Sequence, residues 1–120
     1  MSAYRKEKVL RFPLEGDPWE FEETHTSLFS YGKPGMFQVA PTVKNYIDFV
    51  LEYDGDSDGE YGKTRALTEN EKEKYRPVWE QIIPDIDMNK VRLVEFCWYD
   101  CSEAPDYYDD LSDPFYTTEV

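Results

Sequence analysis

The sequence predicts a small α+β domain with a mainly antiparallel sheet of three to four strands, two helices and an acidic, tyrosine-rich C-terminal tail over residues 100–120. Three observations predict this class. A length of 120 residues fits one domain, so residues 1–120 are expected to form a single unit. Ten tyrosines, seven phenylalanines and three tryptophans provide a core. Short apolar segments show both strand and helix periodicities.

The first element is expected to be a strand over residues 6–12 that stops at Pro13. Its lysines favour an edge strand, because lysines protect strand edges from unwanted pairing. The segment from Trp19 to Tyr31 gives conflicting signals. Asp17 and Pro18 could cap a helix, but the alternation that begins at Trp19 slightly favours a strand.

The central segment contains a turn signal followed by helical periodicity. Residues 32–35, Gly-Lys-Pro-Gly, predict a turn, and the short segment 36–40 is expected to pair with the residues before that turn as a hairpin. Apolar residues at positions 43, 46, 47 and 50 have i, i+3, i+4, i+7 spacing. They predict a helix that opens at Pro41 and ends at Gly55.

The second half predicts one helix and one buried strand. Thr68 and Glu71 form a capping box before residues with helical spacing, and Pro77 is expected to break or kink this helix before Pro84 ends it. Apart from Arg92 and Glu95, residues 91–99 are apolar on both alternating faces, which predicts a central strand covered on both sides.

The charge is strongly negative, at −13, and unevenly distributed. The first eleven residues are basic, whereas no lysine or arginine follows Arg92. Such a field repels nucleic acid and anionic membranes and attracts basic proteins, although acidic charge also serves solubility. No apolar run reaches membrane-span length and no signal peptide is recognised, so a cytoplasmic protein with reduced thiols is expected.

A loop at residues 54–59, Asp-Gly-Asp-Ser-Asp-Gly, matches the first half of an EF-hand calcium loop. The second half fails, because Arg65 stands where the closing glutamate should be. A solvated acidic loop is therefore expected, with no metal site and no cofactor. The alternative is a weak divalent-cation site, or small regulatory module, that uses Asp54, Asp56, Asp58 and Glu60.

The sequence gives no positive evidence for an enzyme. His25 is the single histidine, and no adjacent residues supply a nucleophile and an orienting group. Cys97 lies in the apolar strand segment and is expected to be a small core residue, so a pair with His25 is disfavoured. Neither glycine-rich phosphate-loop pattern occurs. No catalytic residue is predicted.

Acidic residues and tyrosines together predict a protein-binding surface. Tyrosine provides contact area at low entropic cost, while carboxylates accept charge-assisted hydrogen bonds from Arg or Lys. An alternative of nearly equal weight is that the tail aromatics pack on the core. The predicted partner-binding residues are Glu20, Glu22, Glu23, Asp54, Asp56, Asp58, Glu60, Asp106, Tyr107, Tyr108, Asp109, Asp110 and Asp113.

The leading functional hypothesis is a non-enzymatic inhibitor that binds a basic nuclease or CRISPR effector by imitating DNA or RNA phosphates. In composition alone, the chain resembles anti-CRISPR and anti-restriction inhibitors encoded by phages or mobile elements. An immunity or antitoxin protein that neutralises one toxin fits the same features. Composition leaves the oligomeric state open.

Substitution of Asp106, Asp109, Asp110 and Asp113 by Asn is expected to slow association with a basic partner, because the tail then contributes less electrostatic attraction. Stopped-flow or surface-plasmon measurement of the association rate checks this. An unchanged rate would move the expected interface to the Asp54 loop or to the Glu20 cluster.

Overall fold

The computed structural model describes residues 4–40, 45–54, 61–99 and 118–119. Two single-turn 3-10 helices, η1 and η2, accompany the main elements. In chain order the elements are β1 (Tyr4–Pro13), α1 (Pro18–Thr24), η1 (Thr26–Leu28), β2 (Phe37–Val39), β3 (Tyr46–Asp54), β4 (Tyr61–Ala66), α2 (Glu69–Glu80), η2 (Met88–Lys90), β5 (Arg92–Tyr99) and β6 (Thr118–Glu119). The predicted tail at residues 100–117 and the predicted loop at 55–60 lie outside the described residues.

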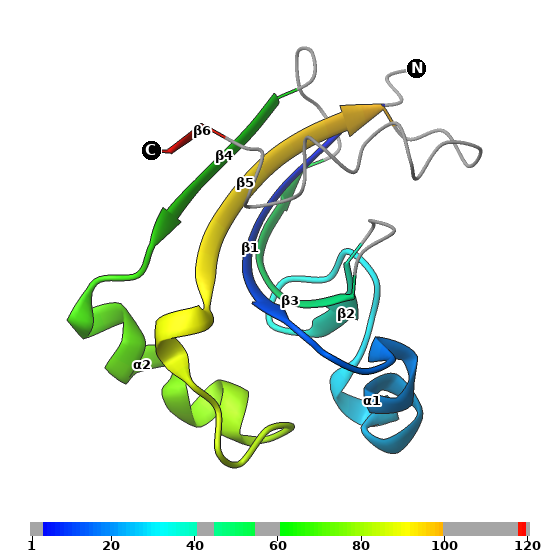
Figure 1. Cartoon of the computed structure of the whole chain (residues 1–120). Helices are drawn as coiled ribbons and strands as arrows, with labels where there is room; N and C mark the ends of the chain where they lie inside the picture. Colours follow the sequence, from blue (N-terminus) through cyan, green and yellow to red (C-terminus); the bar gives the residue numbers. More distant parts are fainter. Residues whose placement is uncertain (1–3, 41–44, 55–60, 100–117, 120) are drawn as a thin grey trace.

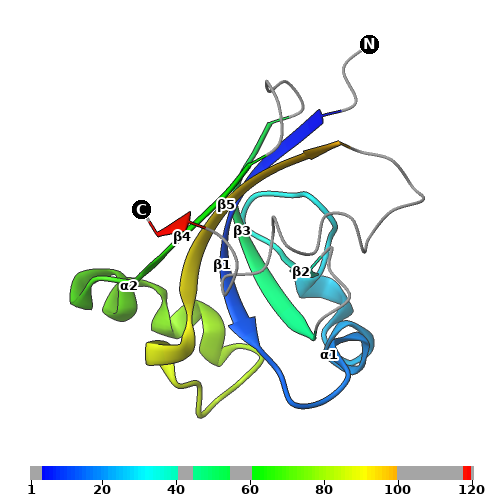
Figure 2. The same ribbon diagram turned by 45° about the horizontal axis from the view of Figure 1, so that its top comes forward.

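One curved sheet organises the molecule. Its strand order is β2-β3-β1-β5-β4-β6, and the first five strands are antiparallel to their neighbours, whereas the two-residue β6 runs parallel to β4. Both helices lie at the same end of the sheet, α2 next to β4 and β5 and α1 next to β2 (Figures 1 and 2). The chain is thus a small domain of two helices and a five-stranded antiparallel sheet, wider than the predicted three to four strands.

The first strand is confirmed, but its predicted edge position is wrong. β1 lies in the middle of the sheet, paired with β3 on one side and β5 on the other. The lysines expected to protect an edge instead pair across strands: Lys6 Nζ lies 3.5 Å from Glu95 and Lys8 Nζ lies 3.1 Å from Glu52. Cross-strand pairs of opposite charge stabilise a sheet, so these lysines stabilise the pairing of β1 with its two neighbouring strands.

The predicted helix between Pro41 and Gly55 is wrong, because residues 46–54 form strand β3. Its side chains are buried on both faces at the start: Tyr46, Ile47, Asp48 and Val50 are all buried. A strand buried on both faces loses the period-two alternation that distinguishes it from a helix. The β-branched and aromatic residues, and the long pairing with β1, decide the outcome.

The turn at residues 32–35 and the short strand after it are confirmed, but the predicted hairpin with the preceding residues is wrong. Gly32 and Gly35 have φ values of 66° and 86°, which favour glycine. β2 pairs with the following strand β3, while Phe29 makes only an isolated parallel bridge to Phe37.

Helix α2 begins as the sequence predicts. The Thr68 side chain accepts from the Glu71 backbone N–H, and the Glu71 carboxylate accepts from the Thr68 N–H at 2.8 Å. Arg65 on β4 donates to both Glu71 oxygens at 2.7 and 2.8 Å, so this residue joins the strand to the helix start. Pro77 does not end α2, which continues to Glu80 because fully buried Trp79 holds the last turn against the core.

Each face of the sheet contributes to a separate core. The larger core lies between the sheet and the helices and contains Leu10, Phe37, Ile47, Leu67, Trp79, Ile82, Ile86, Met88 and Val91. The smaller one, on the other face, contains Val9, Val50, Val94 and Phe96. β5 is central, between β1 and β4, as predicted. It is covered less completely than expected, because the apolar Leu93 is partly exposed.

Replacement of Glu71 by Gln is expected to lower the free energy of unfolding by about 1 kcal/mol near neutral pH, through loss of the cap and the Arg65 pair. Hydrogen bonds from Arg65 and then from the Thr68 backbone lower the pKa of Glu71 from 4.5 to about 2. The stabilisation is therefore complete above pH 4.5 and is lost as the pH falls toward 2. Urea unfolding of both proteins across this range checks the prediction, with exposed Glu73→Gln as control. A pH-independent difference would contradict it.

Candidate interaction surface

Of the predicted partner-binding residues, those whose side chains are described all lie on α1: Glu20, Glu22 and Glu23. Asp54 ends strand β3, but its side chain is outside the described set. Asp56, Asp58, Glu60, Asp106, Tyr107, Tyr108, Asp109, Asp110 and Asp113 lie in segments that the structure does not describe. The structure therefore gives a geometry only for the α1 part of the predicted surface.

The slightly preferred strand after Asp17 is wrong, because residues 18–24 form α1. Asp17 is the N-cap, and its carboxylate accepts from the Trp19 N–H at 3.0 Å. Pro18 occupies the first helical turn, where its missing N–H costs nothing. These start signals outweigh the short alternation that favoured a strand.

α1 has an inner and an outer face. Pro18 is buried, and partly buried Phe21 packs on the larger core. Trp19 stands on the outer side, with Glu22 and Glu23 three and four residues later. Because residues with this spacing are neighbours on a helix surface, these side chains share one face. Packing of the inner face thus leaves Trp19 and Glu23 exposed, with Glu22 half-buried at the border of the two faces.

The charge of this surface is uncompensated within its own segment. Five acids occur from Glu15 to Glu23, whereas no lysine or arginine occurs between Arg11 and Lys33. Within the described part of the chain, Glu20, Glu22 and Glu23 form no ion pair. A cation from another molecule would therefore meet carboxylates that no described residue neutralises.

Trp19 makes this surface more than a charged helix. Trp19 is 58% exposed. Among the described residues, the exposed large hydrophobic residues are Trp19 and Tyr31. Tryptophan is enriched among the residues that contribute most binding energy at protein interfaces. The combination of an exposed indole with carboxylates can bind cations, and arginine best, by stacking and ion pairing.

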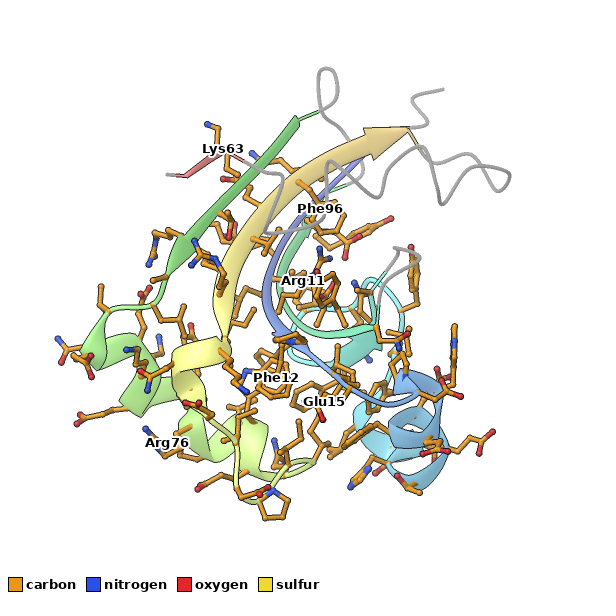
Figure 3. All side chains as sticks on the ribbon, in the orientation of Figure 1. Arg11, Phe12, Glu15, Lys63, Arg76 and Phe96 are labelled. Atoms are coloured by element: carbon orange, nitrogen blue, oxygen red, sulfur yellow. The ribbon has the colours of Figure 1, made fainter. Side chains whose placement is uncertain are left out.

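The second helix carries a different surface. α2 contains four acidic and three basic residues, and Lys72 Nζ lies 3.1 Å from Glu69 and donates to Asn89 at 2.8 Å. Arg76 lies on α2, on the other side of the same end of the molecule from α1 (Figure 3). Its charge therefore does not neutralise the α1 surface.

Arg11, Asp48 and Gln38 form a buried polar row across strands β1, β3 and β2. Arg11 on β1 lies opposite Asp48 on β3, which lies opposite Gln38 on β2. The Arg11 guanidinium donates to both Asp48 carboxylate oxygens, at 2.7 and 2.9 Å, and both side chains are completely buried. Gln38 Nε2 donates to Glu7 at 2.9 Å and to Asp48 at 3.3 Å. One hydrogen-bonded network thus spans β1, β3 and β2.

Aromatic rings enclose the cation of this network. The Arg11 Cζ atom lies 5.4 Å from the Tyr46 ring centroid and 5.3 Å from that of Phe96. Figure 3 shows Arg11 and Phe96 on the same side of the sheet. The polar row therefore sits beside the smaller core, where a low dielectric makes the loss of either charged partner costly.

The row also reaches the segment that follows α1. The Gly32 N–H donates to Gln38 Oε1 at 2.7 Å, and the Ser30 N–H donates to the Phe37 carbonyl at 2.9 Å. Phe29 packs on Phe37, with ring centroids 5.8 Å apart. Because residues 29–32 are held on β2 in this way, the position of α1 depends on the polar row.

His25 has a structural environment at the C-terminal end of α1. Its Nδ1 lies 2.9 Å from Thr24 Oγ1 and 3.2 Å from the Phe21 carbonyl oxygen, and its ring stacks on Phe21 with centroids 6.3 Å apart. The Cys97 side chain lies outside the described set, so its predicted core position stays a prediction.

Sequence reasoning missed Trp19 and the polar row. The Asp17-Pro18 helix start was the signal that could have identified Trp19. A helix from Pro18 places the indole beside Glu22 and Glu23, whereas the alternating pattern of residues 19–22 favoured a strand. The polar row gives no local signal. Arg11, Gln38 and Asp48 come together only through strand pairing over 37 and 10 residues.

Replacement of Asp48 by Asn is expected to lower the free energy of unfolding by about 3–5 kcal/mol, because the buried Arg11 charge loses its carboxylate. Chemical denaturation measures the loss. Glu52→Gln, which removes only an exposed pair with Lys8, should cost less than about 1 kcal/mol. If Asp48→Asn does not fold, the double variant Arg11→Met with Asp48→Leu should recover much of the stability. Equal losses for Asp48→Asn and Glu52→Gln would contradict the prediction.

Three further findings concern the kind of protein this is. Among the described residues, no group of three or more His, Cys, Asp or Glu side chains is placed to hold a metal ion. No helix in the same part of the chain has the length and apolar character needed to cross a membrane. No family model matches the chain, and neither a curated protein nor a solved structure matches it significantly.

Proposed function

We propose that this protein is a non-enzymatic, cytoplasmic inhibitor that binds a basic, nucleic-acid-handling protein and imitates the phosphate charges of its DNA or RNA. A nuclease or a CRISPR effector is the expected class of partner. Such proteins hold nucleic acid in positively charged clefts, which a surface of fixed carboxylates can occupy. Direct binding to nucleic acid is excluded from the proposal, because a charge of −13 repels phosphate.

The observation that carries the proposal is the α1 surface. The segment from Glu15 to Glu23 contains five acidic residues, no basic residue and an exposed tryptophan. Charge that served only solubility would require neither this clustering nor the tryptophan. The capped helix fixes the backbone of Glu20, Glu22 and Glu23, so little backbone order is lost when a partner binds. The acidic residues of the predicted tail add to the negative charge of the protein.

Affinity capture from the native host, followed by competition with labelled duplex DNA, tests the proposed function. The captured protein should be basic, and added inhibitor should displace its DNA in fluorescence polarisation. The affinity of the two proteins should fall as salt rises, because screening weakens attraction between opposite charges. Retention of DNA at saturating inhibitor, or an affinity indifferent to salt, would contradict mimicry. Capture of a toxin that binds no nucleic acid would instead favour an immunity protein.

The α1 carboxylates should control the rate of this association. Glu20→Gln with Glu23→Gln is expected to slow association roughly two- to tenfold at low ionic strength, with a smaller effect at high salt. Glu73→Gln with Glu80→Gln removes the same charge from α2 and is the matched control. Stopped-flow kinetics with the captured partner measures both. Equal slowing by the two double variants would show that net charge alone, and not the α1 surface, directs the encounter.

A further inference from the structure

Trp19 is exposed although the local fold does not require its ring. The backbone N–H of Trp19 donates to the carboxylate of the N-cap residue Asp17, and Pro18 and Phe21 form the inner face of α1. The indole itself is part of neither core cluster, and the residue is 58% exposed. Exposure of so large an apolar ring is typical of a binding surface when polar groups surround it.

The surroundings of the ring select a cation. Glu22 and Glu23 follow Trp19 by three and four residues, the spacing of neighbours on a helix surface; Glu23 is exposed and Glu22 is half-buried. Neither forms an ion pair within the described part of the chain. The face of an indole carries negative electrostatic potential, so it attracts the same cations as the carboxylates. Phosphate or an acidic peptide would meet repulsion from both groups.

We infer that Trp19, Glu22 and Glu23 form a docking site for an arginine side chain of the basic partner. This inference rests on the proposed function and names the group that the α1 surface receives. The planar guanidinium can stack on the indole while its edge donates to a carboxylate, two interactions that a compact lysine ammonium cannot make together as well. The site should therefore prefer arginine over lysine.

The interior of this protein already contains one arginine bound in this manner. Arg11 lies between the rings of Tyr46 and Phe96 and donates to both oxygens of Asp48. The α1 surface offers the same two kinds of group, an aromatic face and carboxylates. Unlike Asp48 at the Arg11 site, the α1 carboxylates form no ion pair with any lysine or arginine among the described residues.

Octa-arginine and octa-lysine peptides of equal charge test this site by isothermal titration calorimetry with the full chain. The wild-type protein should bind octa-arginine more tightly. Trp19→Ala should weaken octa-arginine binding roughly three- to tenfold and octa-lysine binding less than about twofold. Trp19→Phe, which keeps an aromatic face, should retain part of the preference. Circular dichroism checks that each variant folds.

Two matched controls separate the site from general electrostatics. Tyr31→Ala removes the other strongly exposed ring and should leave the arginine preference unchanged. Glu22→Gln with Glu23→Gln should weaken octa-arginine binding more than Glu73→Gln with Glu80→Gln, although both remove two charges. The inference is overturned if Trp19→Ala weakens both peptides equally or neither, or if the two double variants have equal effects.

The outcome is separable from that of the proposed function. If the arginine preference depends on Trp19 but the captured partner binds no nucleic acid, the docking site stands and mimicry fails. If the captured partner is displaced from DNA but its affinity is unaffected by Trp19→Ala, the function stands and the docking site fails.

Discussion

The bidentate pair between Arg11 and Asp48 is the interaction on which the rest of this structure depends. Both side chains are completely buried, so neither charge can be satisfied by water, and each requires the other. Their strands must pair in the register that places them opposite each other. Gln38 extends the requirement to β2 through its hydrogen bonds to Glu7 and Asp48. A polar network with directional bonds thus specifies the strand alignment, whereas apolar packing supplies most of the stability.

The same network connects the interior to the surface. Gln38 accepts from the Gly32 backbone, and Phe37 holds the residues that follow α1, so the helix position depends on β2. α1 then divides its residues between two roles: Phe21 packs inward, while Trp19 and Glu23 are exposed and Glu22 is half-buried beside them. The acidic segment is therefore held on a fixed backbone, and the mixed charges of α2 lie on the other side of the same end of the molecule (Figure 3).

Local signals in the sequence predicted the parts that local chemistry determines. The capping box of Thr68 and Glu71 and the glycine turn at 32–35 are examples, because a few neighbouring residues fix each geometry. β3 was missed because burial on both faces removed its alternation, and β1 was misplaced at an edge because its cross-strand partners Glu52 and Glu95 are distant in sequence. The acidic character of α1 was predictable from composition, but the exposure of Trp19 depended on choosing the helix.

The central claim is that the outer face of α1 receives basic groups through Trp19. The indole N–H signals of isotopically labelled protein test this directly, because the chain has three tryptophans and Trp79 is completely buried. During titration with octa-arginine, the Trp19 signal should move along a saturable curve while the Trp79 signal stays in place. A stationary Trp19 signal at peptide concentrations that shift the backbone amides of α2 would contradict the claim.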